Sequence, residues 1–101
     1  MTLPRDLFLG FIKLHILYHA GREPAYGLWL IDELAEHGYR LSPGTLYPIL
    51  HSLEKEGLLV IENRVVNGKA RKYYHLTEAG RSALAQGKEK AQELLAEIQK
   101  S

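Results

Sequence analysis

The chain has 101 residues, of which 46% are hydrophobic and none is cysteine. This composition predicts one globular domain and excludes both disulfides and thiolate metal sites. The formal net charge is only +1, but residues 58–77 contain four Lys or Arg against one Glu, so positive charge is concentrated in one segment.

The first predicted helix spans residues 6–20 and is apolar on nearly every side. A helix of this kind is normally buried on more than one face, so we expect a second subunit to cover part of it. Asp6, Lys13 and His15 interrupt the apolar run, which therefore resembles neither a signal peptide nor a membrane span. We expect a soluble, cytoplasmic protein. Gly21 is predicted to end this helix.

A second helix is predicted over residues 26–37, with Gly38 as its C-terminal cap. Its helical wheel places Trp29 on the polar side, among acidic residues. An exposed tryptophan there either marks an interface or ligand surface, or covers a neighbouring segment.

A third helix is predicted from Pro43 to about Glu56, with Ser42 as its N-cap. Proline is compatible with the first helical position, but Pro48 lies further inside the helix. Its ring should crowd the preceding turn and leave the carbonyl of Gly44 without its helical hydrogen bond. We therefore expect a kinked or irregular start to this helix.

Two strands follow, over residues 58–66 and 70–76, joined by an Asn-Gly turn that strongly favours a hairpin. Thr77 is the expected N-cap of a last helix over residues 78–100. Three helices followed by a two-stranded hairpin predict an α+β, mainly α fold: a winged helix-turn-helix with an additional C-terminal helix. Residues 1–77 form the predicted winged helix-turn-helix domain, and residues 78–101 form a dimerisation helix of the same compact unit.

The third helix and the hairpin both carry side chains that are suited to contact DNA. Opposite its apolar side, the helix carries small, polar and weakly basic residues, with its carboxylates toward the flanks, which is typical of a helix in the major groove. Cations on the hairpin can hold phosphates. The alternatives are an ordinary solvated helix face and a charged edge strand that resists aggregation. The predicted DNA contacts are Ser42, Gly44, Thr45, Tyr47, Pro48, His51, Ser52, Lys55, Arg64, Lys69, Arg71 and Lys72.

The last helix has small or aliphatic residues at a 4-3-4-3-4 spacing, from Gly80 to Ile98, which predicts a short heptad seam. We expect this seam to pair with a second subunit and with the apolar first helix. Packing of the same seam within one chain is the alternative. The predicted dimer-interface residues are Phe8, Phe11, Ile12, Leu84, Gly87, Ala91, Leu94 and Ile98.

The sequence contains only weak signals for a metal site or for enzyme activity. His15 and His19 are spaced i, i+4, as in some metal sites, but no third ligand lies nearby in the sequence, so we predict no metal. His51 lies near serine and threonine hydroxyls without an orienting carboxylate, so we predict no enzyme activity. No cofactor is predicted. A winged helix that binds proteins instead of DNA remains the alternative function.

Two segments resemble one family closely. GTLYPILHSLEKEGLL (residues 44–59) and VNGKARKYYHLTEAG (residues 66–80) are similar to the PadR family of bacterial and archaeal transcriptional regulators. The opening of the second helix at Tyr26-Gly27 and the segment Leu14–Leu17 fit the same pattern. The resemblance covers about residues 10–84.

The resemblance implies a homodimer that binds palindromic double-stranded operator DNA, usually as a repressor released by a small molecule. It places Gly44 to Pro48 on the recognition helix, and Lys72 to Thr77 on the strand that leads to the dimerisation helix. Some small members of the family bind flat aromatic drugs between tryptophans of their last helices. Residues 78–101 contain no aromatic side chain, so the resemblance does not extend to that mechanism. The operator, the regulated gene and the inducer are not identified by the sequence.

Overall fold

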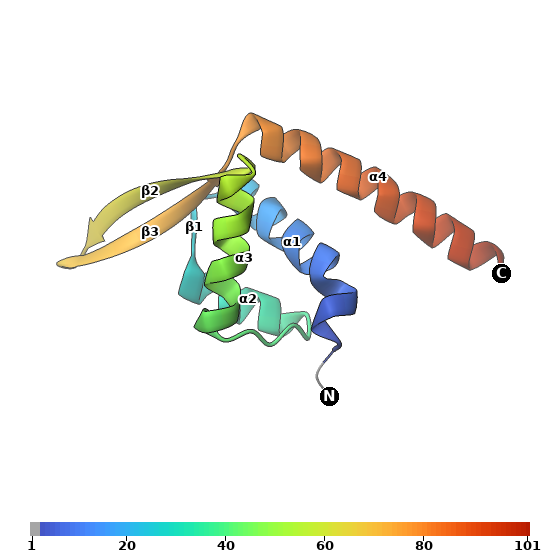
Figure 1. The fold of residues 1–101 in the computed structure, drawn as a ribbon, viewed down its shortest axis with the longest axis horizontal. Coiled ribbons are helices and arrows are strands. Elements are labelled where there is room, and N and C mark those ends of the chain that lie inside the picture. Colours follow the sequence, from blue (N-terminus) through green and yellow to red (C-terminus); the bar gives the residue numbers. More distant parts are fainter. Residues whose placement is uncertain (1–2) are drawn as a thin grey trace.

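The computed structural model describes residues 3–101. Over these residues the chain forms a winged helix with an additional C-terminal helix, as predicted. The hairpin and the last helix project from opposite sides of a helical body (Figure 1). The elements in chain order are α1 (Arg5–Arg22), β1 (Ala25–Tyr26), α2 (Gly27–Glu36), α3 (Pro43–Lys55), β2 (Leu59–Val66), β3 (Lys69–Leu76) and α4 (Glu78–Lys100).

The core lies between α1, α2 and α3 and extends to the base of the hairpin. The core is formed by aliphatic side chains at helical spacing, and these side chains are almost completely shielded from water. None of its fully buried large side chains comes from α4. They are Ile12, Ile16, Leu30, Leu34, Leu46, Leu50, Leu53 and Leu59.

Most of the predicted helix ends and the predicted hairpin turn are confirmed. Gly38 and Gly57 have φ of +88° and +80° where α2 and α3 end, a conformation that glycine adopts without steric cost. Asn67 and Gly68 also have positive φ, at 53° and 78°, as a two-residue hairpin turn requires. The Thr77 hydroxyl accepts a hydrogen bond from the backbone N–H of Gly80 at 3.0 Å and caps α4.

The connection after α1 differs from the prediction. Gly21 does not end the helix, which continues to Arg22. A Cβ at this position would lie 2.7 Å from Leu76 Cδ2, so the glycine permits close packing against β3. The expected loop contains the two-residue strand β1, which pairs with β3 through Ala25–Tyr74 and Tyr26–Tyr73. The sheet order is therefore β1-β3-β2.

Helix α3 is continuous from Pro43 to Lys55, so the predicted interruption of its first turns is wrong, while a kink at Pro48 stays a prediction. Pro48 removes the donor for the Gly44 carbonyl, but Gly44 and Pro48 are both exposed, so water can hydrate that oxygen. Ser42 is the N-cap residue, yet its side chain does not cap the helix. Its backbone carbonyl instead accepts from the N–H groups of Thr45 and Leu46, at 3.0 and 2.9 Å.

Within residues 3–101, no helix combines the length and the apolar character that are needed to cross a bilayer.

Candidate nucleic-acid interface and dimer surface

A groove of about 390 Å³ lies between the start of α2, helix α3 and strand β3; we call it the wing groove. It brings the predicted helix residue Tyr47 to the predicted hairpin cations, although more than twenty residues separate them in sequence. Its lining residues are Tyr26, Gly27, Leu28, Tyr47, Lys69, Ala70, Arg71 and Lys72.

The hairpin cations do not share one face of the sheet. Arg64 pairs with Arg71 across the two strands, and Lys69 lies two residues further along the same face. Lys72 follows Arg71 directly in the strand and pairs with Asn63, so its side chain projects to the opposite face of the sheet. Positive charge thus surrounds the hairpin, which suits a rod-like element placed against a phosphate backbone.

Two tyrosines hold the arginines in place. The guanidinium carbon of Arg64 lies 4.4 Å from the ring centre of Tyr73, and that of Arg71 lies 4.7 Å from the ring centre of Tyr26. The two rings meet edge to face, with centroids 5.6 Å apart. Stacked guanidinium groups keep their N–H donors available at the edges, so these contacts orient the cations for an anion.

Arg64 also has an acidic partner. Its Nη2 donates to Glu62 Oε1 at 2.8 Å, and His75 Nε2 lies 2.6 Å from the same oxygen. The hydrogen bond from Arg64, followed by that from His75, lowers the pKa of Glu62 to about 2. A phosphate at Arg64 must therefore compete with Glu62, whereas among residues 3–101 the other three cations have no carboxylate partner within salt-bridge distance.

At the start of α3, Tyr47 packs over the first turn of α2. A Cβ on Gly27 would lie 2.6 Å from Tyr47 Cζ, so the glycine makes room for the phenol ring. Tyr47 still exposes 41% of its surface. This arrangement fixes the ring at the edge of the wing groove and leaves it accessible.

A second polar cluster lies at the same end of α3. Ser42 Oγ donates to Thr45 Oγ1 at 3.3 Å, and Arg5 Nη1 donates to the same hydroxyl at 3.4 Å. Arg5 belongs to α1 and was not among the predicted contacts. It adds a cation beside the N-terminus of α3, where recognition helices meet base edges and phosphates.

The C-terminal half of α3 is less suited to DNA than the sequence suggested. The carboxylate of Glu54 lies 3.7 Å from His51 Nδ1, and Glu56 accepts a hydrogen bond of 3.4 Å from Ser52. The expectation of a carboxylate-free outward face is wrong here, because long glutamate side chains reach around the helix from its flanks. Lys55 is exposed in this half.

Three residues near the interface were missed by the sequence reading: Arg5, Tyr26 and Leu28. Tyr26 was assigned to the start of α2, and no sequence pattern pairs it with a hairpin arginine. Leu28 exposes 60% of its surface beside Tyr47 in the wing groove. An apolar side chain on the otherwise acidic side of α2 was the signal that could have identified it.

Helix α4 packs most closely against its own chain over its first half. Gly80 is buried against Leu58 and Leu76, and Gly87 lies against Leu14 of α1. Beyond that point the helix leaves the body (Figure 1), with Leu94 50% exposed and the residues after it also on the surface. Intramolecular packing therefore accounts for the first half of the seam and not for the second.

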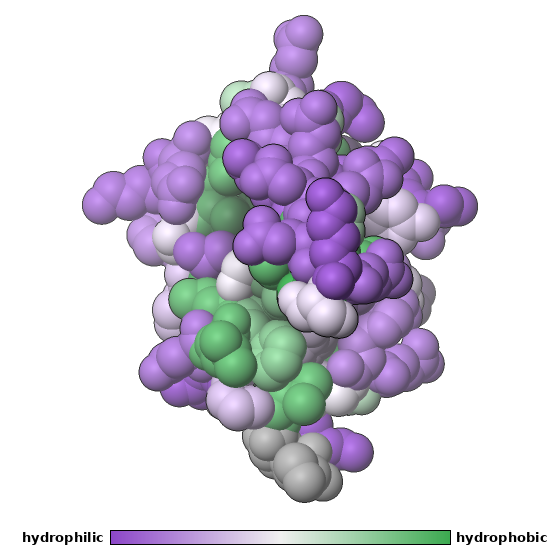
Figure 2. All heavy atoms as spheres, turned by 90° about the vertical axis from the view of Figure 1, so that its right-hand side faces the viewer, coloured by the Kyte–Doolittle hydropathy of each residue, from purple (hydrophilic) through white to green (hydrophobic). Residues whose placement is uncertain are grey.

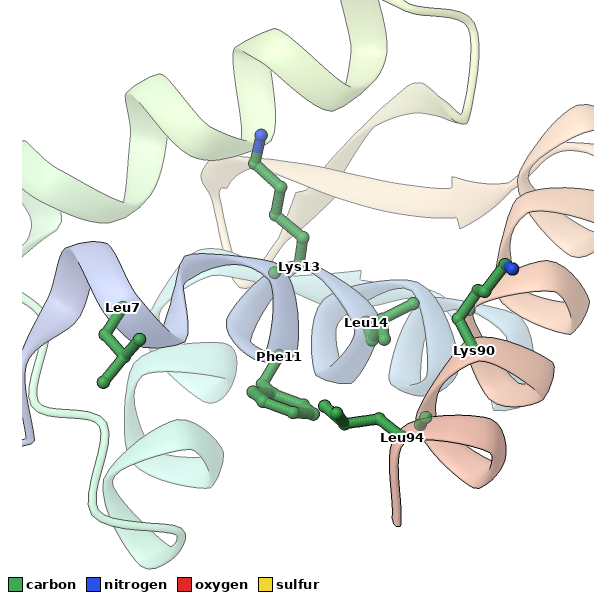
Figure 3. A pocket seen from close by; sticks show the side chains of 9 residues that line it. Leu7, Phe11, Lys13, Leu14, Lys90 and Leu94 are labelled. Atoms are coloured by element: carbon green, nitrogen blue, oxygen red, sulfur yellow. The ribbon is translucent and has the colours of Figure 1, made fainter. Parts of the chain in front are cut away.

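Between the two helices lies an apolar groove of about 400 Å³, which we call the α1–α4 groove. Phe11 of α1 and Leu94 of α4 point toward each other across it, and the amine of Lys13 points away (Figure 3). Figure 2 shows apolar side chains gathered on this side of the molecule, below a hydrophilic region. The groove is lined by Leu7, Gly10, Phe11, Lys13, Leu14, Gly87, Lys90, Ala91 and Leu94.

One predicted interface residue on α1 lies in the core of its own chain. Ile12 is fully buried in the core of its own chain, so its assignment to a dimer surface is corrected. The error arose because a helix that is apolar all round does not reveal which side faces its own core. Phe8 is partly buried, with its ring 6.1 Å from that of Tyr39, whereas Leu7, which was not predicted, is 73% exposed.

The fold brings a third histidine, which is distant in sequence, to the pair on α1. His37, the C-cap residue of α2, joins His15 and His19 of α1, and the ligand atoms of the three side chains lie within 4.8 Å of one another. Trp29 is partly buried and meets His19 edge to face, with centroids 5.4 Å apart. It therefore covers a neighbouring element of its own chain.

Comparisons with known proteins agree with this architecture. Transcriptional regulator Rv3488 of Mycobacterium tuberculosis is 54% identical over 94 residues, which cover 93% of this chain and 88% of that protein. A PadR family transcriptional regulator from Eggerthella lenta has a crystal structure that matches with a TM-score of 0.82, at 36% identity, over 94% of this chain and 84% of that one.

A PadR-like transcriptional regulator from Bacillus cereus superposes with a TM-score of 0.85, at 30% identity, over 94% of each chain. Residues 16–86 of the present chain match the transcriptional regulator PadR-like family. That span contains the helix-turn-helix, the hairpin and the start of α4. The chain therefore belongs to the PadR-like family of transcriptional regulators, and its role is regulatory, not enzymatic.

Proposed function

We propose that the chain is a homodimeric repressor that binds palindromic double-stranded operator DNA. The N-terminal half of α3 enters the major groove, with Tyr47 and Thr45 at its leading end. Lys69, Arg71 and Lys72 of the hairpin hold phosphates. The observation that carries this proposal is the wing groove, which joins an exposed tyrosine of α3 to these cations.

A second subunit completes the proposed molecule. The α1–α4 groove and the exposed second half of α4 form one apolar surface, which a partner's α4 would remove from water. Two-fold symmetry would then place two recognition helices on successive major grooves, about 34–36 Å apart. We assign the effector implied by the family resemblance to the α1–α4 groove, where a small apolar molecule would contact both helices.

The test begins with selection of bound sites from random duplex DNA, and a palindrome is the expected result. Binding to the selected site is then measured by fluorescence anisotropy at several salt concentrations. Three hairpin cations in each of two subunits neutralise about six phosphates, so the logarithm of the affinity should fall against that of salt with a slope of about −5.

The variant Arg71→Ala with Lys72→Ala should reduce that slope to about −2. Lys88→Ala with Lys100→Ala is the matched control, because it removes the same charge from the exposed side of α4 and should keep the slope of the unmodified protein. An equal effect of the two double variants would refute the proposed role of the hairpin. Absence of salt-dependent binding to any duplex would instead favour a protein-binding winged helix.

A further inference from the structure

We propose that His15, His19 and His37 form a binding site for a divalent transition metal ion of the zinc class. Two of these residues lie on α1 and the third lies where α2 ends, so the site joins two helices that the core also packs together. It lies outside the wing groove and the α1–α4 groove.

The spacing of the histidines suits coordination. His15 and His19 are one helical turn apart, and their rings lie nearly parallel, with centroids 6.3 Å apart and 12° between the planes. The ring centroids of His37 and His15 lie 4.4 Å apart. Nitrogen ligands on a tetrahedral zinc ion lie about 3.3 Å from one another, given Zn–N bonds of about 2.0–2.1 Å. The observed upper limit of 4.8 Å requires only small rotations of the imidazoles.

The surroundings of His15 and His19 disfavour the charged form of both side chains. Burial, followed by the charges of His37 and His19, lowers the pKa of His15. Burial is likewise the largest cause of the lowered pKa of His19, which Glu33 opposes. Neutral imidazoles have a free lone pair, and metals bind that form.

Glu33 acts as a positioning residue beside the cluster. Its Oε1 lies 3.3 Å from Nε2 of His19 and 3.6 Å from Nε2 of His37, so one carboxylate contacts a histidine from each helix. A carboxylate in this place orients the imidazoles and balances part of the charge of a bound cation. Imidazole ligands select zinc, copper, nickel or iron over magnesium and calcium, which prefer oxygen.

The test uses the full chain without an affinity tag, freed of metal with a chelator and then dialysed. Titration calorimetry with Zn²⁺ should give one ion per chain, and Co²⁺ should give the visible absorption of a nitrogen-coordinated ion. Trp29, the only tryptophan, lies against His19, so Co²⁺ should also quench its fluorescence with the same stoichiometry.

His37→Ala is the informative variant, because the His37 side chain is exposed at the end of α2 and removing it leaves the buried core unchanged. It should weaken Zn²⁺ binding by about 100-fold or more, and Glu33→Gln should weaken it by about 10- to 100-fold. His51→Ala, which removes an exposed histidine from α3, should bind as the unmodified protein does. The proposal is overturned if the unmodified chain binds no stoichiometric Zn²⁺, or if His37→Ala and His51→Ala bind it equally.

Discussion

Substitution of Gly27 by alanine should impair DNA binding without unfolding the protein. The new Cβ would lie 2.6 Å from Tyr47 Cζ, whereas ordinary contacts begin near 3.4 Å, so the ring must move by at least about 0.8 Å. The fold should tolerate this movement, since Tyr47 is 41% exposed and alanine is the better helix former. The thermal midpoint should therefore change by only a few degrees.

The effect on affinity follows from the contact that the moved ring would lose. A hydrogen bond between the tyrosine hydroxyl and a phosphate contributes about 1.5–3 kcal/mol, which corresponds to roughly ten- to a hundredfold in affinity for each subunit. Fluorescence anisotropy with a selected operator measures this loss. Circular dichroism and thermal unfolding of the same sample report whether the fold is retained.

A double-mutant cycle identifies the cause. If Gly27→Ala acts through the displaced ring, it should have no further effect in a protein that already carries Tyr47→Ala. Additive losses in the cycle would show that the glycine acts independently of Tyr47. Full affinity of Gly27→Ala would show that the position of the ring is not needed for binding.

Three further predictions concern the dimer, the packing of α4 and the hairpin. Leu94→Glu should convert the dimer to monomers in sedimentation, because it places a charge in the proposed seam; an unchanged mass would contradict the seam. Gly80→Ala should destabilise the fold by about 1–3 kcal/mol, since its Cβ would meet the Leu58 carbonyl, whereas Ser82→Ala on the exposed side of α4 should not; a raised thermal midpoint for Gly80→Ala would refute this packing. The carboxyl group of Glu62, with its pKa near 2, should remain ionised in NMR titrations below its ordinary value of 4.5, so its pairing stabilises the hairpin above about pH 4.5 and is lost as the pH falls toward 2. Added salt should move that midpoint back toward 4.5, because the group is exposed, and a midpoint of 4.5 at low salt would exclude the pair.

Features that depend on a few neighbouring residues could be predicted from the sequence. The Asn67-Gly68 turn, the Thr77 cap and the glycine ends of α2 and α3 each follow from local backbone preference. They determine where the elements begin and end. Their order was then sufficient to identify a winged helix.

Features that depend on distant residues could not be predicted. Strand β1 has only two residues, and its partner on β3 is almost fifty positions away. His37 reaches the other two histidines only after α2 has folded back on α1. The burial of Ile12 depends in the same way on which side of α1 receives α2 and α3. Periodicity within one helix contains no information about these arrangements.

Because α4 is anchored mainly in its first half, a small tilt of the helix would displace its C-terminal end. The helix is 23 residues long, or about 34 Å, and Gly80, Leu84 and Gly87 in its first half pack against the rest of the chain, while the residues after Ala91 are exposed. A tilt of about 10° at Gly87 would move the C-terminal end of the helix, about 20 Å further on, by about 3 Å. In a dimer whose tips are joined, the same tilt would instead displace the two bodies, and with them the spacing between their recognition helices.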